Sequence, residues 1–250
     1  MPRLCSSSWF GATTVGPRVA DEGEFAGIPQ NGLDFLAGLS ANNTRAFFEE
    51  HRTTYRQAVL EPAKALVTAL GDELRERISP AIRSEPRVGR SLFRINRDLR
   101  FSRDRTPYDP RIDVVLWEGD DPRSSPCFFV RVTAANVVVG AGAFRLGGEA
   151  LDRFRAAVLD ADRGSELVSI LAAIRHADGL VDVSPPGRKR IPPGYPAEHP
   201  RAELLLYESL HASMTRPLPR VVTTAAFVDW CADRHERLAP LHRWLVGATG

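Results

Sequence analysis

Residues 112–144, IDVVLWEGDDPRSSPCFFVRVTAANVVVGAGAF, contain three short runs that decide the fold class. The runs at 112–118, 127–134 and 136–144 are rich in β-branched and aromatic residues, which favour strands, and turn residues separate them. The last two are so close in sequence that they predict a hairpin. No gap has room for the crossover helix that parallel strands need, so the pattern predicts an antiparallel meander. SLFRIN at 91–96 is expected to add a further strand.

Segments with apolar residues at three- and four-residue steps flank this region on both sides, and this spacing is typical of helices. Pro62 and Pro240 predict a kink or break within two of them. Asn42 or Asn43 is expected to cap one helix start, and a threonine is expected to cap the last helix. The helices are predicted at 31–39, 47–70, 149–162, 165–177, 200–214 and 223–247.

Composition and length agree with one domain of ordinary character. The chain has 250 residues, 43% hydrophobic and 26% charged, and its net charge of +2 is too small to indicate a nucleic-acid binder by itself. Three widely spaced cysteines fit a reducing cytoplasm, and no run approaches the roughly 20 apolar residues of a membrane helix. We therefore predict a cytoplasmic α+β domain over residues 25–247. Its mainly antiparallel sheet is covered by N- and C-terminal helices, and residues 1–24 form a disordered leader outside the fold.

The most unusual segment is SLFRINRDLRFSRDRTPYDPR, residues 91–111, which gathers six arginines and three aspartates. A guanidinium donates two parallel hydrogen bonds to a phosphate or carboxylate, so the cluster predicts a pocket for an anionic small molecule. The aspartates could equally neutralise the arginines in a structural ion-pair lattice. A protein or nucleic-acid interaction module is a third alternative, although the charge balance argues against a nucleic-acid partner.

In the pocket interpretation, four arginines clamp the ligand, and two aspartates orient them or act as a general base. A tyrosine forms a wall. If the strand continues from Ser91, Phe93 and Ile95 anchor it in the core, while Arg94 and Asn96 share the other face. The candidate residues in this segment are Arg94, Asn96, Arg97, Asp98, Arg100, Arg103, Asp104 and Tyr108.

This segment resembles the hallmark of an uncharacterised, mainly bacterial family, domain of unknown function family 2461. The hallmark reads approximately R-I-x-R-D-x-R-F-S-x-D-K-x-P-Y-K. Arg105 replaces its lysine, and Asp109 reverses the charge of its last position. Two other stretches, NNTRAFFEEHRTTY at 42–55 and RKRIPPGYPAEHP at 188–200, are similar to further blocks of the family. The resemblance covers residues 25 to about 212 and implies no activity.

Each of the three blocks is an irregular junction that carries polar groups. If they converge, they could surround one anion, and the helix start near Asn43 would add free N–H donors. The alternatives without a ligand are that the two asparagines only form a cap and a turn, and that the basic run at 188–190 is a solvated loop. The additional candidates from the outer blocks are Asn42, Asn43, Lys189 and Arg190.

Other chemistry has little support. The six histidines are scattered, with no H-E-x-x-H and no paired C-x-x-C, so no metal site is expected. The sequence has no P-loop and no G-x-S-x-G, and no cofactor is expected. Gly140 and Gly142 within a strand predict a bulge or a close backbone approach. The sequence does not decide whether the protein is an enzyme or whether it forms homo-oligomers.

Overall fold

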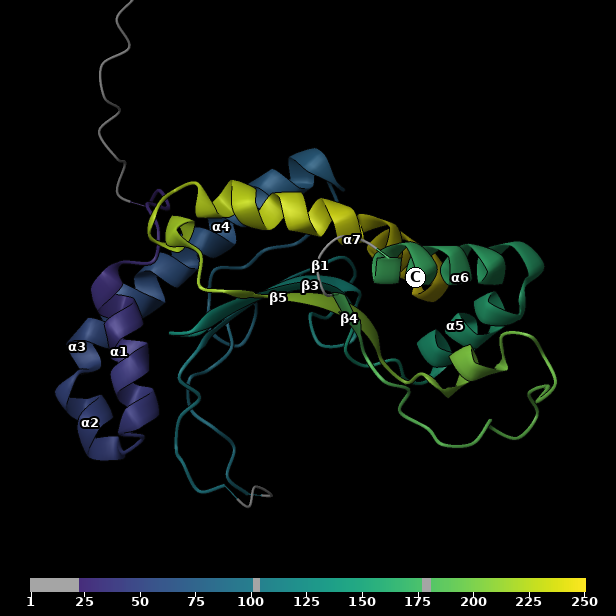
Figure 1. Cartoon of the computed structure of the whole chain (residues 1–250), viewed down its shortest axis with the longest axis horizontal. Helices are drawn as coiled ribbons and strands as arrows, with labels where there is room; N and C mark the ends of the chain where they lie inside the picture. The colour runs from purple at the N-terminus through teal and green to yellow at the C-terminus, as the bar shows by residue number, and fades with distance from the viewer. Residues whose placement is uncertain (1–22, 101–103, 177–180) are drawn as a thin grey trace, which may run out of the picture.

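The predicted meander lies in a five-stranded antiparallel sheet in the computed structural model, which describes residues 23–100, 104–176 and 181–250 (Figure 1). The spatial order is β1-β2-β3-β5-β4, so β5 pairs with β3 although a long helical segment separates them in sequence. The predicted α+β class is confirmed; the leader at 1–24 lies almost wholly outside the described residues and stays a prediction. The strands are β1 Ile112–Trp117, β2 Cys127–Val132, β3 Asn136–Ala143, β4 Val181–Val183 and β5 Leu210–Pro217.

The hairpin between β2 and β3 is confirmed. The backbone N–H of Thr133 donates to the carbonyl of Asn136 (2.9 Å), and the Thr133 hydroxyl accepts from the Asn136 N–H (3.0 Å). The close approach predicted at the β3 glycines is also present. A Cβ on Gly140 would overlap the ring of Phe129 on the neighbouring strand, and a Cβ on Gly142 would overlap His211. The sequence therefore keeps both positions free of side chain where other groups need the space.

Helices cover one face of the sheet. In Figure 1, α4 and α7 lie across it, and α5 and α6 pack at one end, so the predicted cover by N- and C-terminal helices is confirmed. No described helix crosses the opposite face of β1, β2 and β3 in this view. The helices are α1 Gln30–Ala41, α2 Arg45–Glu50, α3 Arg52–Thr54, the π-helix η1 Tyr55–Leu60, α4 Glu61–Arg77, α5 Glu149–Leu159, α6 Ala161–His176, the 3-10 helices η2 Ala202–Leu206 and η3 Arg220–Thr223, and α7 Phe227–Thr249.

The core lies between the sheet and the helices α4 and α7. Phe128 of β2 packs against two buried histidines of α7, with ring centroids 5.0 Å from His235 and 4.3 Å from His242. Arg77 at the end of α4 joins the two helices through ion pairs with Asp229 (2.7 Å) and Asp233 (2.9 Å). No helix in the described part of the chain combines the length and apolar character needed to cross a membrane.

The helix predicted at 200–214 is wrong. A short 3-10 helix, η2, ends at Leu206, and the chain then enters β5, where Leu210, Ala212 and Met214 alternate with more exposed residues. This segment has helix-forming residues, but its backbone pairs with β3 along eight residues. Tertiary pairing overrides local propensity here.

The strand predicted at 91–96 is also wrong. Leu92 and Asn96 form only isolated bridges, with Val114 and Tyr108. Leu92 and Ile95 are buried, three residues apart, whereas the period of a strand is two. Phe93 therefore lies at the surface with an exposed fraction of 55%, although it was expected to anchor the core.

The expected helix boundaries are found only in part. Thr44 caps α2 by accepting the N–H of Phe47 (3.2 Å), so neither Asn42 nor Asn43 is the cap. Pro62 lies in the first turn of α4, directly after η1, so the helical pattern changes from π-helix to α-helix beside this proline. Pro240 lies inside α7, which continues through it, and no threonine side chain caps that helix. Pro240 has no backbone N–H, so the helix lacks one hydrogen bond at this point. The helix tolerates this loss because the turns on both sides keep their own backbone hydrogen bonds.

Candidate functional site

The arginine motif leaves the sheet as a narrow arm, which we define as residues 94–100 and 104–110. Figure 1 shows it descending from the sheet on the side away from α4 and α7. Backbone hydrogen bonds close its base: the Arg97 N–H donates to Pro107 (2.9 Å), and the Asp109 N–H donates to Ile95 (2.7 Å). The predicted site residue Arg103 lies outside the described residues.

The structure brings the first family block to the base of this arm. The Asn43 side chain bonds the backbone of Tyr108 in both directions, and the Phe48 ring stacks on the Tyr108 ring with centroids 4.4 Å apart. Tyr108 is only 5% exposed, so it serves as an anchor of the arm. It lines a small pocket of about 280 Å³ beside α2 and η1, which is separate from the main groove described below. Asn42 ends α1 and accepts a hydrogen bond from Thr44.

The third family block does not join them. Its loop lies at the opposite end of the sheet, beside α5 (Figure 1). Arg188 pairs with Glu208 (2.7 Å), and the Arg155 guanidinium lies over the Tyr195 ring at 5.2 Å. Lys189 and Arg190 are exposed on this loop. The hypothesis that all three blocks surround one ligand is therefore wrong.

A groove of about 630 Å³ follows the root of the arm and the open face of the sheet, and we call it the arginine groove. Six arginines and three aspartates line it, so the fixed charges of its lining favour an anion. It is lined by Gly89, Arg90, Leu92, Phe93, Arg94, Asn96, Arg97, Asp98, Arg100, Asp109, Arg111, Asp113, Val115, Pro122 and Arg123.

Part of the predicted ion-pair lattice is present in the arm. Arg97 pairs with Asp104, donates to the Thr106 hydroxyl (2.6 Å) and lies 3.5 Å from Asp109. The backbone N–H of Thr106 and the Arg97 guanidinium lower the pKa of Asp104 to about 2. Arg97 is thus fully engaged within the protein and fixes the shape of the arm.

Asp98 is engaged in the same way. Its carboxylate accepts from the Arg100 guanidinium (2.7 Å) and from the Arg100 backbone, and these hydrogen bonds lower the pKa of Asp98 to about 2. A general base works best with a pKa near the working pH. Both motif aspartates are therefore better suited to orienting guanidiniums than to accepting a proton.

On the sheet side of the groove, Asp113 of β1 lies between two arginines. It accepts from Arg111 (2.8 Å) and from Arg131 of β2 (2.6 Å). Opposite it, Arg90 pairs with Glu85 (2.5 Å), and its guanidinium lies over the Trp117 ring at 5.2 Å. These pairs hold the walls of the groove in place.

Two arginines of the groove differ from the others. Among the described residues, the guanidiniums of Arg94 and Arg123 have no hydrogen bond or ion-pair partner, and both side chains are exposed. The Nε–H of Arg90 is buried and has no acceptor in the described part of the chain. Among the described residues, Arg94 and Arg123 therefore offer free guanidinium donors to the groove, whereas the Arg90 Nε–H is enclosed by the protein.

Sequence reasoning found Arg94, Asn96, Arg97, Asp98 and Arg100 as groove residues. It missed other charged residues of the groove. Arg111 is the last residue of the segment 91–111 and Arg90 directly precedes that segment, so both could have been found from their position in the sequence. Arg123 stands in the turn between β1 and β2, and Asp113 stands in β1. Only the fold brings these two residues to the arginine groove.

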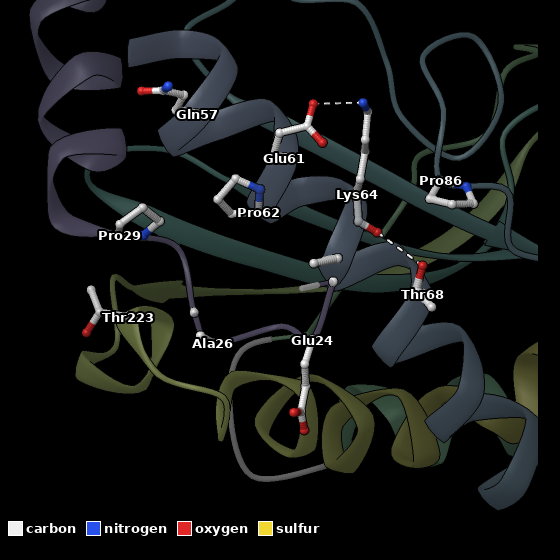
Figure 2. Close-up of a pocket in the computed structure, with 13 residues that line it drawn as sticks. Glu24, Ala26, Pro29, Gln57, Glu61, Pro62, Lys64, Thr68, Pro86 and Thr223 are labelled. Atoms are coloured by element: carbon white, nitrogen blue, oxygen red, sulfur yellow. Dashed lines mark hydrogen bonds and ion pairs between the residues drawn. The ribbon is translucent and has the colours of Figure 1, made fainter. Parts of the chain in front are cut away.

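A larger pocket of about 730 Å³ lies elsewhere, between residues 23–29 and the start of α4 (Figure 2). Two of its charged groups are paired with each other, since Lys64 bonds Glu61 at 2.9 Å. Figure 2 shows the Glu24 carboxylate pointing away from Lys64. This pocket holds none of the predicted site residues, and its lining does not converge on a ligand group.

Two histidines and two cysteines are buried in the described part of the chain. His235 and His242 share one face of α7 in spite of Pro240, and both are buried. Within the described residues, no group of three or more His, Cys, Asp or Glu side chains could hold a metal ion. Burial raises the pKa of the Cys127 thiol to about 12, so this thiol stays protonated near neutral pH.

Comparison with known proteins gives one match. The sequence model of a family described as a conserved hypothetical protein (DUF2461) matches residues 31–244, which is most of the chain. A search of the curated proteins found no match.

Proposed function

The chain belongs to domain of unknown function family 2461, and because that membership brings no activity with it, we propose from the geometry that the arginine groove binds a small molecule bearing phosphate or carboxylate groups. The observation that carries this proposal is a pair of guanidiniums, Arg94 and Arg123, that lie in one concave site and have no partner among the described residues. Guanidinium forks match the oxygens of these anions, and charge-assisted hydrogen bonds are the strong ones.

The internal ion pairs support the same proposal. Arg97, Arg100 and Arg111 are held by aspartates, so they shape the groove and need no ligand. Arg94 and Arg123 then supply the free charge, from the arm and from the β1–β2 turn. A site built in this way is largely formed before the ligand arrives, which reduces the cost of binding.

The proposal is tested by thermal melting of the wild-type protein with inorganic phosphate, pyrophosphate, sugar phosphates and dicarboxylates. A ligand at 100 times its Kd stabilises the folded state by about 2.7 kcal/mol, so a true ligand should raise the melting temperature by about 5–10 °C. The double variant Arg94→Ala/Arg123→Ala should lose this shift. The control is Arg237→Ala, which removes a single exposed arginine, on α7 across the sheet.

Two outcomes would contradict the proposal. In the first, none of the anions shifts the wild-type melting temperature. In the second, the shift persists undiminished in Arg94→Ala/Arg123→Ala. Loss of the shift in the Arg237→Ala control would show only that net charge matters, and would also count against a localised site.

We further propose a cytoplasmic location in a bacterial cell. Cys127 and Cys231 are both free and buried, which suits a reducing compartment. Fractionation of a bacterial species that carries the protein tests this, and recovery outside the cytoplasmic fraction would contradict it.

A further inference from the structure

The arginine groove continues into an apolar groove on the same open face of the sheet. The second groove has a volume of about 300 Å³. Phe93, Pro122 and Arg123 line both grooves, so the two form one elongated site with a charged half and an apolar half. Such a site suits a ligand that has two chemically different ends.

The apolar half is built from aromatic rings that the fold leaves uncovered. Phe93 is 55% exposed and Phe144 is 45% exposed. Of the four large hydrophobic side chains that are exposed among the described residues, these two line this groove. Large exposed apolar groups gathered at one place usually mark a binding site.

The floor of this half is a third ring. Phe129 of β2 occupies the space above Gly140 of β3, where a Cβ would overlap it. Its centroid lies 4.9 Å from that of Phe144. Glycine at this position therefore lets the Phe129 ring lie on the sheet, which gives the groove an aromatic floor with Phe144 at its side.

A cation stands where the two halves meet. Asp113 pairs with two arginines at this border, whereas the Arg123 guanidinium has no partner among the described residues. Arg94 lies in the charged half. Several free donors suit a phosphate monoester better than a single carboxylate, because it offers three acceptor oxygens and up to two charges.

We propose that the ligand is a mononucleotide, with its phosphate held by Arg94 and Arg123 and its base stacked on Phe144 and Phe129. This inference rests on the proposed function, because it names the class of anion that the same groove takes. Bases stack well on aromatic side chains whatever their identity. The concave site has the size of a single small ligand, which favours a mononucleotide over an extended strand.

The test is isothermal titration with ribose 5-phosphate and with the four nucleoside monophosphates. The base should tighten binding by about ten-fold or more over ribose 5-phosphate. Phe144→Ala should remove most of this advantage and leave ribose 5-phosphate binding unchanged. Val168→Ala is the matched control, since Val168 is also 45% exposed but lies on α6. Far-UV circular dichroism checks that each variant is folded.

The results separate this inference from the proposed function. If ribose 5-phosphate or a dicarboxylate binds as tightly as every nucleotide, the mononucleotide is wrong and the anion site stands. If no anion binds at all, both are wrong. A tetranucleotide that binds about a hundred-fold more tightly than the monophosphates would also overturn the inference, since it would indicate a surface for single-stranded nucleic acid.

Discussion

The side chain of Asn43 pairs with the backbone of Tyr108, 65 residues further along the chain, as a neighbouring strand would. Its Nδ2 donates to the Tyr108 carbonyl (2.9 Å), and its Oδ1 accepts from the Tyr108 N–H (3.1 Å). Only an amide offers a donor and an acceptor side by side. One residue at the turn between α1 and α2 therefore holds the base of the arm that carries the arginine groove.

Replacing Asn43 by alanine should destabilise the protein by about 1–3 kcal/mol, because two partly buried backbone groups lose their partners. The measurement is the free energy of unfolding from urea denaturation. Asn42→Ala is the control, and its effect should stay within about 0.5 kcal/mol because Asn42 is exposed. Equal effects of the two substitutions would show that the Asn43 pairing does not hold the arm.

Gly164→Ala and Gly247→Ala should change stability in opposite directions, although both glycines lie in helices. A Cβ on Gly164 would overlap the Arg201 guanidinium, which donates to the Val158 and Asp160 carbonyls at the end of α5 (both 2.8 Å). A Cβ on Gly247 makes only an ordinary contact. Gly247→Ala should therefore stabilise by about 0.5–1 kcal/mol, the usual gain in a helix, and Gly164→Ala should lower stability. Thermal melting measures both; a gain in Gly164→Ala would contradict the role of Arg201.

Stability should fall as the pH drops from about 6.5 toward 3. Burial lowers the pKa of His235 to about 3, against 6.5 for an ordinary histidine, so in this window the unfolded chain binds a proton that the folded protein does not. The His235 imidazole alone then makes the free energy of unfolding rise by about 1.4 kcal/mol per pH unit. Urea denaturation between pH 7 and 4 measures the slope. His235→Gln should reduce it by about that amount, and an unchanged slope would count against the buried neutral imidazole.

Arg97→Ala and Arg94→Ala should separate the structural from the free arginines. Arg97 holds Asp104 and Thr106 across the arm, so its removal should loosen this segment, whereas Arg94 holds no described residue. Limited thermolysin digestion at low enzyme concentration reports local opening. We expect several-fold faster cleavage between residues 98 and 106 in Arg97→Ala and the wild-type rate in Arg94→Ala. The same rate in both variants would mean that the ion pairs do not order the arm.

The sequence predicts well those parts of the fold whose signal is local. The runs that become β1, β2 and β3 carry it in their own composition, and the α5 and α6 helices carry it in their spacing. β5 could not be predicted in this way. Leu210 to Met214 follow a helix-forming stretch, and their strand conformation depends on hydrogen bonds with β3. Phe93 was misplaced for a similar reason, because the chain at this point is irregular.

The candidate site, like the fold, could be predicted from the sequence only in part. The arginine motif could be recognised from its composition, but which guanidiniums are free depends on pairs made in three dimensions. Asp113 engages Arg111 and Arg131 from different segments, and Arg123 joins the groove from a turn. Lys189 and Arg190 lie on a loop at the other end of the sheet, away from the arginine groove (Figure 1). Residue type led to the hypothesis of an anion site, whereas the position of each side chain came only from the fold.

The order of the strands has a consequence for biosynthesis. β5 inserts beside β3 only after α5, α6 and the loop that follows them have been made, and α7 covers the sheet later still. On the ribosome, the nascent meander therefore displays an unpaired β3 edge and the part of its apolar face that α7 will cover until synthesis has passed residue 249. Such intermediates are prone to aggregate, so this chain has a long window in which a chaperone would bind it.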